Sequence, residues 1–246
     1  MPLRDHFRPP LVGRLPWRSL HSGWCSEITR RLNRQMPPGY YALENMSTDG
    51  GFEIDIGAAE GESHGGARRT AGGGGGTAVV PSPAVYTPPA ARGSCSYTAP
   101  DLAEVRVFTA DENKIVAAIE LVSPRNQDRP GARDDFVGKC LNYIASGVSL
   151  VIVDVVTTRR TNFHNTLVEA LRGPVEVELP DDEPIYAAAY RPTGESGKPR
   201  IEFWAYALRV GDQLPTMPLR LLGNQFLPVE LEVTYTTTCE ERLLEG

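Results

Sequence analysis

The sequence has few cysteines, and their spacing does not suit metal or disulfide chemistry. There are four in 246 residues, scattered along the chain without a Cys-x-x-Cys pair: Cys25, Cys95, Cys140 and Cys239. This pattern excludes a zinc-finger type of site and a disulfide framework. The first six residues also lack the apolar core of a signal peptide. We therefore expect reduced cysteines and a cytoplasmic protein.

Long apolar runs and an excess of basic charge are also missing. The longest apolar runs are strand-sized, so we expect no membrane-spanning segment. The formal net charge is -6 and the pI about 5.3, which argues against general attraction to nucleic-acid phosphates and so against a nonspecific nuclease. A local basic rim could still form from the arginines near the candidate site, although we expect most of them to be simply solvated: Arg125, Arg129, Arg133, Arg159 and Arg160.

No Ser/His or Cys/His arrangement indicates a nucleophilic enzyme. The glycine run at 72–76 lacks the Lys-Ser/Thr pair and the helix of a phosphate-binding loop. The surrounding segment, 57–98, is mostly Gly, Ala, Pro and Ser, and we expect it to be a flexible insertion between two strands of one sheet. With 41% hydrophobic and 23% charged residues, the chain is expected to be a single domain over 1–246 that contains this insertion.

Hydrophobic periodicity predicts an α/β fold with a mixed central β-sheet flanked by helices. The strands expected are 40–46, 52–56, 102–108, 115–122, 148–156, 184–190 and 201–210, and the helices expected are 17–33, 135–146 and 162–171. His21 lies beside the apolar stripe of the first helix and is expected to pack, whereas His164 is expected to be exposed. In the tail, alternation over 229–235 predicts a strand, while Pro228 followed by Glu230 suits a helix start.

One carboxylate stands in an unusual context. Glu120 interrupts a nearly continuous apolar run at 115–122, which is typical of a strand buried on both faces. A carboxylate there is costly unless a cation, a metal ion or hydrogen bonds meet it. Glu120 is therefore a candidate metal ligand, and the alternative is a structural ion pair with Lys139 or Arg125.

The helix that follows carries a second polar feature. Asp135, Lys139 and Tyr143 are spaced four apart and share one face, although Asp135 and Lys139 could be only an exposed ion pair. Gly147 stands where a helix C-terminal glycine is expected. Glu44, in an earlier strand, is a further carboxylate that could join a metal site, although strand carboxylates of this kind are usually solvent-facing.

Several motifs over 100–156 carry a resemblance. They are Pro100-Asp101, the run Ile119 to Pro124 with Asn126 close behind, Lys139, and Ser146-Gly147-Val148 leading into Val151 to Asp154. This order resembles a widespread bacterial family known as a domain of unknown function, and it is similar to restriction-endonuclease-like proteins of the PD-(D/E)xK nuclease superfamily. Weaker similarity to the same family occurs near the start, at Trp17 followed by His21, and near the end, at 214–219. The resemblance implies a restriction-endonuclease-like core and favours a helix over 228–244.

The same resemblance implies a site and an activity. Asp101 and Glu120 would hold a divalent cation, Mg²⁺ or Mn²⁺, and Lys139 would assist a water molecule in hydrolysing DNA or RNA. The chain departs from the usual pattern in two places: the superfamily's lysine position holds Val122, and the family's lysine after Ser-Pro-x-Asn is Gln127. Lys139 would thus be a lysine supplied from the helix. The competing hypothesis is a noncatalytic interaction protein that retains the nuclease-like scaffold.

Overall fold

The computed structural model describes most of the chain outside one long segment. The described ranges are 1–14, 16–47, 102–183, 185–193, 199–223 and 225–242. The expected strand at 52–56, the expected insertion at 57–98 and the candidate ligand Asp101 lie outside these ranges.

A six-stranded mixed sheet is the centre of the described fold, in the order β1-β2-β3-β4-β5-β6. All neighbours are antiparallel except β3 and β4, which are parallel. The strands are β1 Tyr40–Ser47, β2 Leu102–Thr109, β3 Ile115–Leu121, β4 Ser149–Asp154, β5 Ile185–Thr193 and β6 Arg200–Leu208. The apolar runs of β3 and β4 place these strands in the middle, where both faces are covered. The predicted α/β class with a mixed sheet is confirmed.

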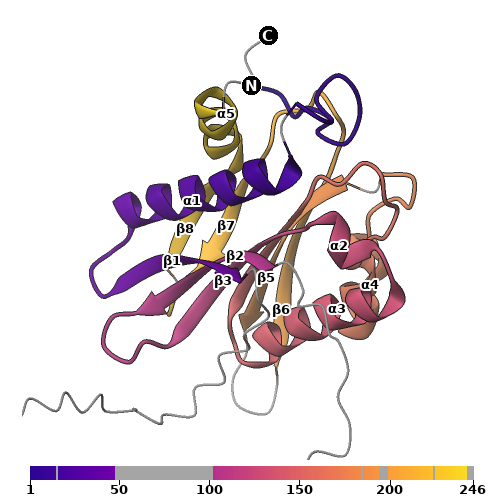
Figure 1. Cartoon of the computed structure of the whole chain (residues 1–246). Coiled ribbons are helices and arrows are strands. Elements are labelled where there is room, and N and C mark those ends of the chain that lie inside the picture. Colours follow the sequence, from indigo (N-terminus) through magenta and orange to yellow (C-terminus); the bar gives the residue numbers. More distant parts are fainter. Residues whose placement is uncertain (15, 48–101, 184, 194–198, 224, 243–246) are drawn as a thin grey trace, which may run out of the picture. The chain divides into compact units, whose positions relative to one another are not determined.

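Helices cover the two faces of this sheet (Figure 1). One face packs against α1 Trp17–Gln35, α5 Leu231–Glu241 and the hairpin of β7 Thr216–Arg220 with β8 Phe226–Glu230. The other face carries α2 Pro124–Gln127, α3 Pro130–Ala145 and α4 Phe163–Ala170, and a 3₁₀ turn follows at Val175–Val177. Because β3 and β4 are parallel, the chain has to cross over between them, and α2 and α3 form that crossover.

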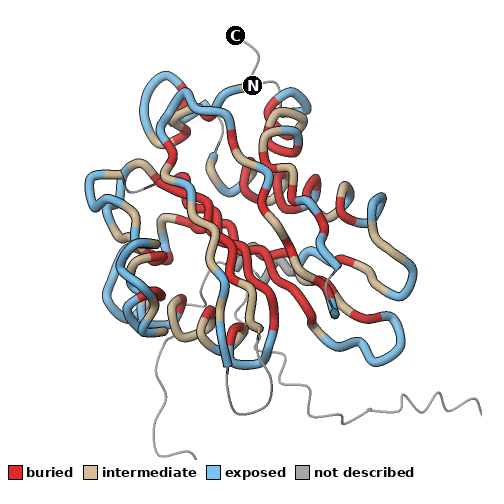
Figure 2. The backbone as a smooth tube through the Cα atoms, turned by 180° about the vertical axis from the view of Figure 1, so that it is seen from behind, coloured by how far each residue is buried: buried red, intermediate tan, exposed pale blue. Residues whose placement is uncertain are grey.

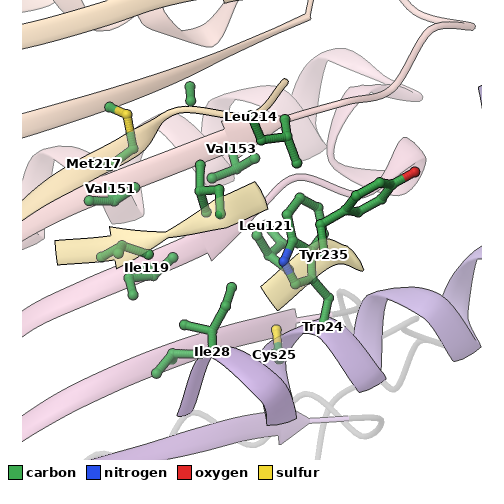
Figure 3. Close-up of a cluster of buried hydrophobic side chains, with 14 of the residues drawn as sticks. Trp24, Cys25, Ile28, Ile119, Leu121, Val151, Val153, Leu214, Met217 and Tyr235 are labelled. Carbon is green, nitrogen blue, oxygen red and sulfur yellow. The ribbon is translucent and has the colours of Figure 1, made fainter. Parts of the chain in front are cut away.

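Two hydrophobic clusters lie on opposite faces of the sheet, and the strands form the buried centre between them (Figure 2). On the α1 side, Trp24 and Ile28 face Ile119 and Val151 of the sheet (Figure 3). Trp24 also meets Tyr235 of α5 edge to face, with ring centroids 5.2 Å apart. The apolar stripe that predicted the first helix is thus the surface that packs on the sheet.

Most predicted elements are confirmed within a few residues, and Gly147 ends α3 with φ of 77° as expected. The tail contains both alternatives in succession, the strand β8 and then the helix α5. The prediction that His164 is exposed was wrong: it is fully buried, with Nδ1 2.8 Å from the Tyr190 hydroxyl and Nε2 2.8 Å from the Val177 carbonyl oxygen. These partners come from β5 and the 3₁₀ turn, which local periodicity does not reveal.

Candidate functional site

Strand register brings two glutamates together on the α3 side of the sheet. Glu104 of β2 lies directly opposite Glu120 of β3 in the antiparallel pair. Both side chains are on the face opposite to Val105 and Ile119, because side chains alternate along a strand. Glu104 is fully buried and Glu120 is 2% exposed. Two carboxyl groups therefore share one buried location.

Lys139 reaches both carboxylates from α3. Its Nζ lies 2.8 Å from Glu120 Oε1, donates to Glu120 Oε2 at 2.8 Å, and lies 3.4 Å from Glu104 Oε2. The predicted alternative of an ion pair between Glu120 and Lys139 is thus confirmed. The Lys139 side chain is 22% exposed, so it lies between the buried carboxylates and the surface.

Arg106 and Tyr143 complete the cluster on the side of Glu104. Arg106 forms an ion pair with Glu104 and donates from Nε to the Tyr143 hydroxyl at 3.1 Å, and that hydroxyl donates to Glu104 Oε2 at 3.0 Å. Lys139 and Tyr143 lie one helical turn apart on α3, as their spacing predicted. We call Glu104, Arg106, Glu120, Lys139 and Tyr143 the carboxylate cluster. Its two acidic and two basic side chains balance in formal charge.

The two glutamates have opposite pKa shifts. Burial raises the pKa of Glu120 well above its usual value; the charge of Lys139 opposes this rise and the charge of Glu104 adds to it. Burial also disfavours ionised Glu104, but a hydrogen bond with Glu120 and the charges of Lys139 and Arg106 outweigh it and lower its pKa to about 2. A proton bound by the pair therefore resides on Glu120. Burial lowers the pKa of Lys139, but Glu120 and Glu104 outweigh it, and the net shift is upward.

Other candidates from the sequence are not in the cluster. Asp101 lies outside the described residues, three positions before Glu104. The Asp135 side chain is exposed to solvent and does not belong to the cluster. Glu44 is exposed and accepts a hydrogen bond from Ser26 of α1 at 2.5 Å, on the other side of the sheet. Val122 is fully buried in the hydrophobic cluster beneath α3.

Sequence reasoning missed Glu104 and Arg106. Both alternate with Val105 and Val107, a pattern that is typical of a strand with one wet face. The signal that could have found them is the pairing of β2 with β3, since only that register sets Glu104 against Glu120.

A second buried carboxyl group lies at the end of β4. Asp154 is fully buried, and it accepts hydrogen bonds from Gln127 Nε2 at 2.7 Å and from the Val156 backbone N–H at 3.0 Å. Burial raises its pKa well above the usual value, while these two hydrogen bonds oppose the rise. Gln127 is thus an uncharged donor to a buried acid.

The carboxylate cluster suits a small divalent cation in its donor set. Mg²⁺ is usually held by one or two carboxylates, with water and substrate phosphate completing its shell. Glu104 and Glu120 converge on one ammonium, and Glu120 Oε1 contacts that ammonium at 2.8 Å. No third histidine, cysteine, aspartate or glutamate gathers with them among the residues described. These two carboxylates are therefore the residues that could hold a metal ion.

Comparisons with known proteins give no relative. No family model matches the chain, and neither a curated protein nor a solved structure matches it. None of the described helices combines the length and the apolar character needed to cross a bilayer.

Proposed function

We propose that the carboxylate cluster is the catalytic centre of a divalent-metal-dependent phosphodiesterase that acts on nucleic acid. The observation that carries this proposal is the meeting of Glu104 and Glu120 on neighbouring strands with Lys139 in contact with both. Paired carboxylates with an adjacent ammonium supply what phosphodiester hydrolysis needs, namely cation ligands and a positive group beside the phosphate. The restriction-endonuclease-like core is part of the same proposal and would consist of α1, β1 to β4 and α3.

Each residue of the cluster has a role in this proposal. Glu104 and Glu120 would hold Mg²⁺ or Mn²⁺, which when bound lowers the pKa of a water ligand and stabilises charge on the phosphate. Lys139 orients the attacking water and stabilises the developing negative charge. Arg106 and Tyr143 hold Glu104 in place through the ion pair and the hydrogen bond described above. Asp101 remains a proposed further ligand on the strength of the resemblance.

Cation binding by this cluster depends on pH. Glu120 must give up its proton before it can ligate a metal ion, and its pKa is raised by burial. The pKa of Lys139 is shifted upward, so Lys139 stays charged and can pair with Glu120 once Glu120 is ionised. The affinity for Mn²⁺ is therefore expected to rise with pH.

A noncatalytic scaffold is the second candidate, and the charge balance of the cluster favours it. Glu120 is 2% exposed and paired with Lys139, and Glu104 is paired with Arg106, so protein cations already neutralise both acids. Such a closed ion-pair network can have a purely structural role, in which it holds α3 in place on the sheet. In that case the fold would present a binding surface without hydrolysis.

A cleavage assay separates the two candidates. We expect Mn²⁺-dependent hydrolysis of labelled single-stranded or duplex DNA or RNA, and a loss of at least about 10²-fold in Glu120→Gln, because a charged cation ligand becomes neutral. The matched control is Glu202→Gln in β6, a glutamate that is 49% exposed, and its rate should stay within about twofold of wild type.

Circular dichroism must show that both variants are folded. If the wild-type protein hydrolyses none of the four substrates with Mn²⁺ or Mg²⁺, the catalytic proposal is wrong and the scaffold remains. Equal activity in Glu120→Gln and Glu202→Gln would also overturn it.

A further inference from the structure

Arginine is distributed very unevenly over this acidic chain. Three segments contain nine arginines, four aspartates and no lysine or glutamate, which gives them a formal charge of +5: 1–18, 124–135 and 157–162. The rest of the chain has a formal charge of -11. We call the surface formed by these segments the basic edge. Its arginines are Arg4, Arg8, Arg14, Arg18, Arg125, Arg129, Arg133, Arg159 and Arg160.

Hydrogen bonds bring the three segments together. Thr157 donates to Asp5 Oδ1 at 2.7 Å, which joins the turn after β4 to the N-terminal segment. Arg159 Nη2 lies 2.6 Å from Asp128 Oδ1, which joins the same turn to the α2–α3 connection. Arg133 donates from Nε to the Gln127 carbonyl at 3.0 Å. The three arginine-rich segments of the sequence therefore meet in space.

The basic edge lies at the carboxyl ends of the parallel strands β3 and β4. Residues 124–135 follow β3, and residues 157–162 follow β4. The third segment, 1–18, leads into α1, which contacts this end of the sheet. His21 Nε2 of α1 lies 2.7 Å from the carbonyl oxygen of Leu121, the last residue of β3. Ligands of open α/β sheets commonly bind beyond the carboxyl ends of the strands.

This edge is also next to the carboxylate cluster. Glu120 immediately precedes Leu121, and Arg133 lies six residues before Lys139 on α3, which corresponds to about 9 Å along the helix axis. Phosphates in one strand of B-DNA are spaced about 3.4 Å apart along the axis. A nucleic acid whose phosphodiester reaches Lys139 would thus place neighbouring phosphates at the basic edge.

Most of the arginines are accessible, and their aspartates are partly neutralised. Arg8 is 67% exposed and Arg159 is 42% exposed, while Arg129 and Arg160 are also exposed. Two of the four aspartates of the edge already have a cation nearby, Asp5 at 3.7 Å from Arg8 and Asp128 at 2.6 Å from Arg159. The exposed guanidinium groups of Arg129 and Arg160 are thus positioned at the surface where a ligand could reach them.

We propose that the basic edge binds the phosphate backbone of a nucleic acid and guides it to the carboxylate cluster, an inference that rests on the proposed function for its substrate. Arginine supplies planar, bidentate donors that match phosphate oxygens, and the edge contains arginine without lysine. Several charges spread over three segments suit an extended polyanion better than a single small anion. In this proposal the basic edge contributes to binding affinity, and its arginines take no part in hydrolysis.

The test measures binding without metal, so that it does not depend on hydrolysis. Fluorescence anisotropy with a labelled 20-nucleotide single strand and the matching duplex, in EDTA and from 50 to 200 mM KCl, gives the affinity and its salt slope. We expect Arg129→Ala/Arg160→Ala to weaken binding at least about tenfold at 50 mM salt. The slope of log affinity against log salt should become flatter by about 1.4 to 1.8, because two phosphate contacts are lost.

Two matched variants control this experiment. Arg34→Ala/Arg200→Ala removes the same charge from exposed arginines at the far end of α1 and the start of β6, and should bind like wild type. Arg129→Lys/Arg160→Lys keeps the charge and should retain the wild-type slope. Arg129 makes no side-chain capping hydrogen bond to α3, so its loss should not unfold the helix.

Three results would overturn the proposal: no binding by the wild-type protein at 50 mM salt, equal weakening in both alanine pairs, or displacement of the DNA by poly-glutamate as effectively as by unlabelled DNA. Wild-type activity and the arginine variants together distinguish this inference from the proposed function. Binding by a wild-type protein that hydrolyses none of the substrates refutes the catalytic centre alone, whereas hydrolysis and binding that are unchanged in Arg129→Ala/Arg160→Ala refute the basic edge alone.

Discussion

At the scale of single residues, the buried carboxyl groups of this protein differ in what neutralises them. Glu120 meets the ammonium of Lys139, and Glu104 meets the guanidinium of Arg106. Asp154 has only uncharged donors among its hydrogen bonds, from Gln127 and the Val156 backbone. Burial without a cation favours the protonated acid, and this is the direction in which the pKa of Asp154 is shifted.

This difference makes a prediction for Asp154. Because its pKa is higher in the folded than in the unfolded state, its contribution to stability is complete below the unfolded pKa of about 3.9 and is lost as the pH rises through the folded pKa. Asp154→Asn should remove this loss, because asparagine does not ionise. At pH 7 the variant should be at least as stable as wild type, and at pH 3 its free energy of unfolding should not exceed that of wild type. Gln127 can turn its amide to accept from Asn, since its Oε1 accepts no hydrogen bond in the described structure.

Asp154→Ala is the contrasting variant. It leaves the Gln127 amide and the Val156 N–H without an acceptor and should cost about 1 to 3 kcal/mol of unfolding free energy. Urea denaturation at pH 7 and at pH 3 measures both variants. A large loss in Asp154→Asn at pH 7, equal to that of Asp154→Ala, would mean that the ionised form is required.

At the scale of elements, α3 determines where the lysine of the cluster lies. The helix packs Phe136, Cys140 and Ile144 into the core, which leaves Lys139 and Tyr143 directed toward β2 and β3. It ends at Gly147, whose φ of 77° is a conformation that residues with a Cβ adopt only at a cost. Because Gly147 reverses the chain direction after α3, β4 can begin at Ser149, two residues after Gly147.

Two glycines of this region should respond in opposite directions to alanine. Gly147→Ala should destabilise the protein by about 1 to 2 kcal/mol because of the left-handed backbone, while Gly138→Ala inside α3 should stabilise it by about 1 kcal/mol. A Cβ at either position would meet no atom within 4 Å, so neither change adds a steric clash. Thermal or urea denaturation of the matched pair checks this, and effects of the same sign would contradict the assigned backbone conformations.

At the scale of the whole described fold, the sheet is shared by two hydrophobic clusters. Ile119 faces the α1 side and Ile152 faces the α3 side, and both are fully buried. Since one set of hydrogen-bonded strands supports both clusters, loss of packing on one face should weaken the other.

Ile119→Ala and Ile152→Ala should therefore lower the stability of the whole sheet alike, by about 2 to 5 kcal/mol each. The three tryptophans pack on the α1 side, so their fluorescence reports that side: Trp17, Trp24 and Trp204. In Ile152→Ala the fluorescence transition should shift together with the far-ultraviolet circular dichroism. A shift in the circular dichroism alone would show that the two sides unfold separately.

The sequence by itself determined the local elements and part of the candidate site. Apolar runs specified β3 and β4, and three- and four-residue spacing specified α1 and α3, because each pattern depends only on neighbouring residues. The isolated carboxylate of Glu120 indicated that a buried partner was needed, and the position of Lys139 on the following helix made it a candidate.

Only the tertiary structure decided which long-range partners met. Glu104 became a member of the site through the register of β2 on β3, and His164 became buried through β5 and the turn at Val175–Val177. The basic edge likewise depends on chain segments more than 100 residues apart that meet at one end of the sheet. Local periodicity holds no information on such encounters, since they depend on strand order and on packing across the sheet.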